Sequence, residues 1–236
     1  MIKLYQENAL VWLSERPDKN IDLIVTDPPY WTLDKWREIG TTTRLGGHKN
    51  AEERDNDKWF ATIDEQDLWA LMNEMWRVLK NNSHAYIFCD HETLRYVLSY
   101  ADDMDWRRAK PLVWDKVNQG MGYTYRCRYE FIVFLEKGKR KLNDLSIPDI
   151  LTVKKIINGY PTEKPVKLME ILIRQSSIEG ELVCDPFFGS GSVPIACKNL
   201  KRRFIGCDID LKAHEYFAQR IENQPKLEFT PAEVFK

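Results

Sequence analysis

A strand-like apolar run, Ile21 to Thr26, leads directly into the tetrapeptide Asp27-Pro28-Pro29-Tyr30. Open α/β sheets bind their ligands at the carboxyl ends of strands, so this tetrapeptide stands where chemistry is expected. Two consecutive prolines fix the backbone and hold the Asp27 carboxylate and the Pro28 carbonyl beside an aromatic ring. A planar base with an exocyclic amine fits this group, because the two oxygens accept its N–H donors and Tyr30 stacks on its face. The alternative is an ordinary strand-ending turn.

A second candidate site lies near the other end of the sequence. Leu182 to Asp185 is typical of a strand, Gly189 and Gly191 stand one residue apart in the turn that follows, and Ser192 opens a helix of small residues. Glycines let the backbone approach a ligand closely, and free N–H groups at a helix N-terminus bind a carboxylate or phosphate. The dinucleotide pattern is absent, because Pro194 stands where its third glycine would be.

The next apolar run, Phe204 to Asp208, ends in an acid about 20 residues after the glycines. In nucleoside-binding folds an acid at this place accepts hydrogen bonds from both ribose hydroxyls. The glycine turn and the acid together indicate a nucleoside cofactor. Asp208 or Asp210 alone would be more typical of a helix cap.

Short apolar runs alternate with segments of helical period, which predicts a mostly parallel sheet of about seven strands flanked by helices. The expected strands are Ile21 to Thr26, Ala85 to Cys89, Leu112 to Trp114, Phe131 to Leu135, Leu182 to Asp185 and Phe204 to Asp208, with a weaker one at Lys3 to Tyr5. Helices are expected at Glu65 to Lys80, after Pro165, and near Thr93 to Ser99, Ser192 to Asn199 and Lys212 to Asn223.

The 236 residues suffice for one large domain or two small ones. Because the strand and helix pattern resumes after each polar interruption, we expect one domain over residues 1–236, with loop insertions at about 31–63 and 117–160. The first insertion is too long for a simple connection and is typical of a functional loop or lid.

Composition excludes several classes of protein. With 43% hydrophobic and 30% charged residues the chain is typical of a soluble globular protein, and it shows neither a membrane-length apolar run nor an export signal, so we expect it in the cytoplasm. Five cysteines without a CxxC pair predict neither a disulfide framework nor a zinc knuckle. No metal site is expected, because Asp27, Asp90 and His91 show no ligand spacing that stands out.

The net charge of -1 argues against a uniformly basic nucleic-acid binder, but the average hides a local surplus. Between Arg107 and Lys141 the sequence carries ten Lys or Arg and three acids. Either a solvated basic face or a surface for nucleic-acid phosphates explains this surplus.

The order of the motifs resembles the DNA amino-methyltransferases that use S-adenosylmethionine, in their circularly permuted (β) arrangement with Asp27-Pro28-Pro29-Tyr30 before Asp185-Pro186-Phe187-Phe188-Gly189-Ser190-Gly191. The segment from Pro161 to Leu168 resembles the family's segment before the cofactor loop. The resemblance spans nearly the whole chain. It implies the class I methyltransferase fold, a Rossmann-like α/β fold whose mostly parallel seven-stranded sheet carries helices on both faces.

The resemblance also assigns residues. It implies a catalytic group of Asp27, Pro28, Pro29 and Tyr30 at the target base. It implies that the cofactor contacts Asn8, Ala9, Asp27, Thr162, Lys164, Pro165, Asp185, Pro186, Phe187, Gly189, Ser190, Gly191, Asp208 and Ile209. Asn8 is a departure, because the family often has an Asp there to meet the cofactor adenine; an amide still bonds an adenine edge.

The expected reaction is direct transfer of a methyl group from S-adenosylmethionine to the exocyclic amine of a base flipped out of duplex DNA. Within the family an Asp at the first position of the tetrapeptide goes mostly with adenine N6 and a Ser with cytosine N4, so Asp27 favours adenine-N6. Cytosine-N4 methylation of DNA and adenine methylation of RNA are the alternatives.

With DNA as the substrate, the basic surplus supplies candidate phosphate contacts. They are Arg107, Arg108, Lys116, Arg126, Arg128, Lys139 and Arg140. The loop insertions are too short to form a separate recognition domain, which predicts either a short recognition site or completion of the site by a second subunit of a homodimer. A cognate restriction enzyme, and an origin in a bacterium or phage, fit the resemblance.

Overall fold

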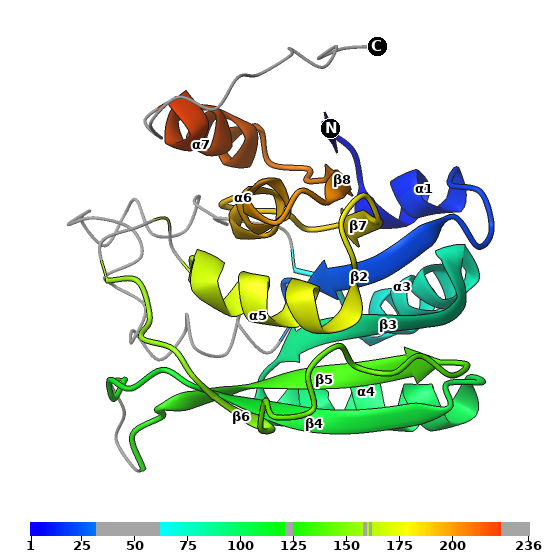
Figure 1. Ribbon diagram of the computed structural model, residues 1–236, viewed down its shortest axis with the longest axis horizontal. Coiled ribbons are helices and arrows are strands. Elements are labelled where there is room, and N and C mark those ends of the chain that lie inside the picture. The colour runs from blue at the N-terminus through cyan, green and yellow to red at the C-terminus, as the bar shows by residue number, and fades with distance from the viewer. Residues whose placement is uncertain (32–61, 121–124, 158–159, 161, 223–236) are drawn as a thin grey trace.

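The computed structural model describes residues 1–31, 62–120, 125–157, 160 and 162–222 (Figure 1). Its strands are β1 (Ile2–Tyr5), β2 (Ile21–Thr26), β3 (Leu79–Cys89), β4 (Arg108–Asp115), β5 (Tyr129–Lys137), β6 (Ile150–Thr152), β7 (Leu182–Asp185) and β8 (Arg203–Cys207). Its helices are α1 (Ala9–Ser14), α3 (Glu65–Val78), α4 (His91–Asp103), α5 (Val166–Ser176), α6 (Ser192–Asn199) and α7 (Leu211–Glu222).

The strands form one sheet in the order β1-β8-β7-β2-β3-β5-β4-β6. β5 pairs antiparallel with β3 and β4, and the remaining described pairs are parallel. This confirms the mostly parallel α/β sheet. The sheet has eight strands rather than the expected seven, because β6, inside the segment expected to be an insertion, extends the edge beside β4. Three residues are too few for a periodic pattern to reveal a strand.

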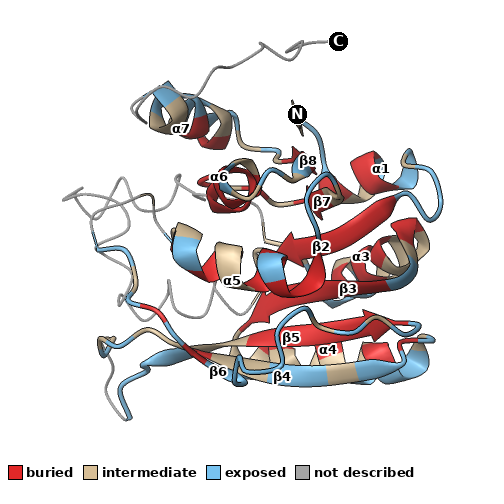
Figure 2. Cartoon of the chain, in the orientation of Figure 1, coloured by how far each residue is buried: buried red, intermediate tan, exposed pale blue. Residues whose placement is uncertain are grey.

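Helices cover both faces of the sheet, with α5 and α6 in front and α3 and α4 behind in Figure 1. Successive residues of a strand point to opposite faces, and β2 shows the result. Leu23 and Val25 belong to the core cluster that includes α5 and α6, whereas Ile24 belongs to the cluster that includes α1 and α3. All six residues of β2 are therefore buried, as Figure 2 shows, which explains its continuous apolar sequence.

The helix expected at 65–80 is α3, and it ends at Val78 because β3 begins at the next residue. Its apolar stripe Leu68, Leu71, Met72 and Met75 is fully buried. The Asp64 carboxylate caps this helix by accepting a hydrogen bond from the Asp67 amide at 2.8 Å. Among the described residues, no helix is long and apolar enough to cross a membrane.

Gly206 in β8 marks a close approach between β8 and β7. A Cβ atom at this position would lie 2.5 Å from the Asp185 carbonyl oxygen and 2.7 Å from the Phe204 ring. Backbone inside a sheet cannot yield as a flexible side chain does, so the position requires glycine.

We predict that Gly206→Ala lowers the free energy of unfolding by about 2–3 kcal/mol, because the added methyl group overpacks the sheet. Gly180→Ala is the control: its Cβ meets no atom within 4 Å, and only its φ of +84° opposes the change, at a cost of about 1 kcal/mol. Urea denaturation of both variants measures the difference. A loss for Gly206→Ala no larger than that for Gly180→Ala would show that the approach is not close.

Candidate active site

The predicted site residues follow neighbouring strands. β1, β8, β7 and β2 are adjacent and parallel, so their carboxyl ends lie along one edge of the sheet. Asn8, Asp208, Asp185 and Asp27 stand at or just after those four ends. The structure thus brings the two candidate sites, more than 150 residues apart in sequence, to one edge.

Asp185 joins the two sites. Its carboxylate is buried, and its Oδ1 accepts hydrogen bonds from Thr26 Oγ1 at 2.8 Å and from the Phe187 amide at 3.0 Å. Burial raises the pKa of Asp185 to about 7. Asp185 therefore fixes the start of the glycine turn against the end of β2, next to Asp27.

The glycine turn has the backbone that its sequence predicts. Gly189 has a φ of +48°, and Gly191, the residue before α6, has a φ of +79°. A Cβ on Gly191 would lie 2.0 Å from the Phe217 ring, so α7 packs directly on this turn. Only glycine satisfies both the left-handed conformation and this contact.

Asp208 lies against the same turn. Its two carboxylate oxygens accept hydrogen bonds from the Gly189 amide and the Asp210 amide, each at 2.9 Å. Burial raises the pKa of Asp208. A carboxylate has about four acceptor positions, so this one keeps capacity for two hydroxyl groups. Ile209 follows it with 56% of its surface exposed, which leaves an apolar side chain open at this edge.

A row of alternating charges crosses the site. The Lys164 ammonium donates to Asp27 Oδ2 and forms an ion pair with Glu130 at 3.0 Å, and Lys116 pairs with the other oxygen of Glu130 at 2.8 Å. Burial raises the pKa of Asp27, and the Lys164 charge opposes that rise. Burial alone would raise the pKa of Glu130 as well, but Lys164 and Lys116 outweigh it and hold that pKa below its ordinary value.

The remaining tetrapeptide residues are packed rather than open. Pro28 is buried, and the Pro29 carbonyl accepts a hydrogen bond from the Ile63 amide at 2.8 Å. Tyr30 is only 4% exposed, and its hydroxyl has no hydrogen-bond partner among the described residues. Burial raises the pKa of Tyr30 well above its ordinary value. The ring thus contributes to the core behind the sheet, and stacking on a base requires it to become exposed.

Glu163 connects the segment before α5 to α7. Its carboxylate accepts from the Tyr216 hydroxyl at 2.9 Å and from the Tyr160 amide at 3.0 Å, and it pairs with Arg220 at 2.6 Å. Arg220 in turn donates to the Ser190 carbonyl at 2.9 Å. The glycine turn is held from this side too, because Ser192 Oγ donates to the Lys164 carbonyl at 2.6 Å.

Sequence patterns did not reveal Glu130, Glu163, Tyr216 or Arg220 as site residues. Their spacing carries no signal, since each acts through partners distant in sequence. Two expected residues also have structural roles: Asn8 Oδ1 caps α1 by accepting from the Leu10 amide at 2.9 Å, and Ala9 is buried as the first residue of α1. Exposed Thr162 and buried Pro165 flank Glu163 and Lys164.

The basic residues expected to contact DNA fall into two groups. Lys116, Arg126 and Arg128 lie beside the end of β4 and the start of β5, at the edge that carries Asp27. Arg107, Arg108, Lys139 and Arg140 lie at the opposite edge, because β5 is antiparallel and its nine residues span roughly 30 Å. Three of these four also form ion pairs: Arg107 and Arg108 with Glu136, and Arg140 with Glu181.

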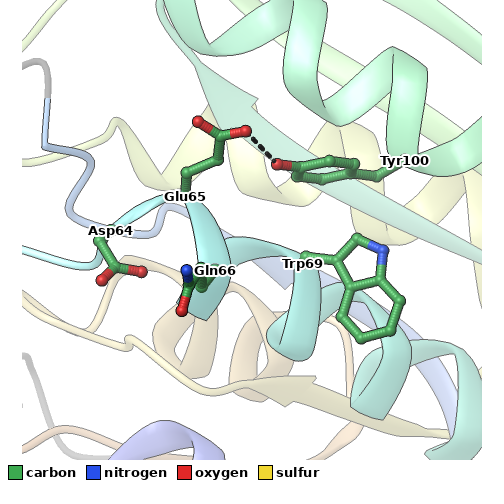
Figure 3. A pocket seen from close by; sticks show the side chains of 5 residues that line it. All are labelled: Asp64, Glu65, Gln66, Trp69 and Tyr100. Atoms are coloured by element: carbon green, nitrogen blue, oxygen red, sulfur yellow. Dashed lines mark hydrogen bonds between the residues drawn. The ribbon is translucent and has the colours of Figure 1, made fainter.

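A separate surface cavity of about 560 Å³ lies at the start of α3 (Figure 3). It is lined by Asp64, Glu65, Gln66, Trp69 and Tyr100, and the Tyr100 hydroxyl donates to Glu65 at 3.0 Å. None of these residues carries a predicted role. Within the described ranges no cluster of three or more His, Cys, Asp or Glu is arranged to hold a metal ion.

Comparison with known proteins identifies the family. A family model of DNA methylases matches residues 21–157 and 147–219. The chain is 28% identical to the Type II methyltransferase M.HpaI of Haemophilus parainfluenzae, over 94% of this chain and 74% of that protein. It is 29% identical to the Type II methyltransferase M.HhaII of Haemophilus parahaemolyticus, over 82% of this chain and 84% of the relative.

Solved structures share the fold. The complex of M1.HpyAVI with S-adenosylmethionine superposes with a TM-score of 0.67 at 22% identity, covering 93% of this chain and 100% of that one. The cytosine-N4-specific PvuII DNA methyltransferase gives a TM-score of 0.70 at 16% identity, covering 92% and 85%.

The motifs, their meeting at one edge of the sheet and the match over most of the sequence agree with one another. The chain belongs to the family of DNA methylases, enzymes that take their methyl group from S-adenosylmethionine.

Proposed function

We propose that this protein methylates the exocyclic N6 amine of adenine in duplex DNA, with the target base turned out of the helix. The observation that carries the proposal is the position of Asp27: its carboxylate stands at the edge of the sheet beside the glycine turn, with Oδ2 bound by Lys164. Within the described residues Asp27 Oδ1 has no hydrogen-bond donor, so it is open to an amine. Cytosine N4 is the second candidate, since the PvuII enzyme of similar fold acts there.

The edge residues fit S-adenosylmethionine. The Asp27 carboxylate and the Lys164 ammonium offer one anion and one cation, which suits the ammonium and carboxylate of the methionine end. Asp208 is placed for the ribose hydroxyls, and the exposed Ile209 for an adenine ring. When bound, the cofactor supplies an electrophilic methyl group.

The chain's own residues orient the target amine. Asp27 Oδ1 and the Pro28 carbonyl accept its two N–H bonds, which draws the nitrogen toward tetrahedral geometry and exposes its lone pair. Rigid backbone at Pro28 and Pro29 fixes the two acceptors relative to each other. The reaction needs no cysteine, and four of the five, Cys89, Cys184, Cys197 and Cys207, are buried.

Among the basic residues, Arg126 and Arg128 are the candidates for DNA phosphates, because they are exposed at the edge that carries Asp27. Lys116 shares that edge but is paired with Glu130. The insertion at 31–63 stays a predicted recognition region, and its residues 32–61 lie outside the described residues. A homodimer and a partner restriction enzyme stay predictions as well.

Asp27→Ala should lower methyl transfer to DNA by about 10³-fold or more, since the acceptor that orients the amine is removed. Transfer of tritiated methyl groups measures the rate, and calorimetry should show that S-adenosylmethionine still binds. Asp149→Ala, which removes an exposed carboxylate paired with Lys110, is the control and should keep full activity. Full activity of Asp27→Ala would refute the mechanism.

The product should be N6-methyladenine. Digestion of the methylated duplex to nucleosides, followed by mass spectrometry, identifies the base. N4-methylcytosine would overturn the choice of adenine but leave the methyl-transfer chemistry intact. Faster methylation of RNA of matching sequence would overturn DNA as the substrate.

Glu163→Gln should weaken the binding of S-adenosylmethionine about tenfold, because Arg220 loses its buried partner and the glycine turn loses a support. Titration calorimetry measures the dissociation constant. Glu170→Gln on the exposed side of α5, where Glu170 accepts from Asn199, should bind normally. Equal affinity of both variants would show that α7 does not hold the cofactor turn.

A further inference from the structure

Glu130 occupies an unusual place for a carboxylate. It is the second residue of β5, at the edge of the sheet that carries Asp27, and its side chain is 17% exposed. Two ammonium groups bind it, Lys164 at 3.0 Å and Lys116 at 2.8 Å. A carboxylate withdrawn from water in this way is retained only where its charges are closely matched.

Lys164 lies between the carboxylates of Asp27 and Glu130. Its side chain is 11% exposed, and its ammonium lies 5.2 Å from the centre of the Phe88 ring. The buried ammonium therefore has two competing anions, one of which is the proposed acceptor for the target amine. Where the ammonium rests between them decides how much of Asp27 is free.

We propose that Glu130 is a positioning residue that draws the Lys164 ammonium to one side of Asp27 and so keeps Asp27 Oδ1 open to the target amine. This inference rests on the proposed function of Asp27. Without the Glu130 charge, Lys164 would have Asp27 as its only anion and would move over both of its oxygens. The target amine would then compete with an ammonium for the same acceptor.

The charges around Asp27 determine the direction of its titration. The groups that face it are Lys164, Glu130, Lys116, Tyr30, Cys89 and Asp185. Burial raises the pKa of Asp27, Lys164 lowers it and Glu130 raises it. Removing the Glu130 charge therefore lowers the pKa of Asp27, and the carboxylate becomes both a weaker acceptor and more firmly bound to Lys164.

The chain offers a matched control on the same strand. Glu136 in β5 is also a buried glutamate with two cationic neighbours, Arg107 at 2.9 Å and Arg108 at 3.6 Å, but it lies at the opposite edge of the sheet. Glu130→Gln and Glu136→Gln thus remove the same charge from similar surroundings. Only the first removal occurs beside Asp27.

We expect Glu130→Gln to lower kcat for DNA methylation about tenfold, whereas Glu136→Gln keeps the wild-type kcat. The acid limb of the pH profile of kcat/KM should move to lower pH in Glu130→Gln alone. Glu130→Asp should recover part of the rate because it restores the charge. Equal rates and profiles for Glu130→Gln and Glu136→Gln would overturn the proposal.

A readout independent of activity separates this proposal from the proposed function. NMR titration of ¹³C-labelled aspartate carboxyls in the full chain, with Asp27 assigned from Asp27→Asn, should show a lower pKa for Asp27 in Glu130→Gln and no change in Glu136→Gln. If wild-type protein methylates no DNA, the proposed function fails, and this titration still decides whether Glu130 controls Asp27. An unchanged pKa in Glu130→Gln refutes that control.

Discussion

The buried ammonium of Lys164 is the constraint on which the site depends. Removing an ion from water costs several kcal/mol unless partners replace the lost solvation, and here Asp27 and Glu130 do so. The three residues come from the end of β2, the start of β5 and the segment before α5. Their charges can meet only if those elements are held in one arrangement. The same contacts that make the fold specific therefore place a carboxylate where an amine can reach it.

Parallel strands supply that arrangement economically. Because β1, β8, β7 and β2 are neighbours, the residues at their carboxyl ends form one line, from Asn8 through Asp208 and Asp185 to Asp27. Hydrogen bonds then join adjacent positions: Thr26 to Asp185, and Gly189 to Asp208. A nucleoside cofactor laid along this line would present its reactive end near Asp27. The order of strands, rather than any single motif, relates the two halves of the site.

Local patterns predicted what local physics determines. The apolar sequence of β2 and the stripe on α3 reveal their elements, because burial on two faces or one leaves a periodic trace. Glycines at positive φ identify the turn at Gly189 and Gly191. Long-range pairs leave no such trace, so Glu130, Glu163 and Arg220 were found only in the structure. The antiparallel direction of β5 likewise put part of the basic stretch at the far edge.

The measurement that tests the central claim most directly is a crystal structure of the protein with S-adenosylhomocysteine, the product form of the cofactor. We predict electron density along the carboxyl edge, with the ribose hydroxyls at Asp208 and the amino-acid end between Asp27 and Lys164. Density confined to the cavity lined by Trp69 and Tyr100 would contradict the assignment of the site.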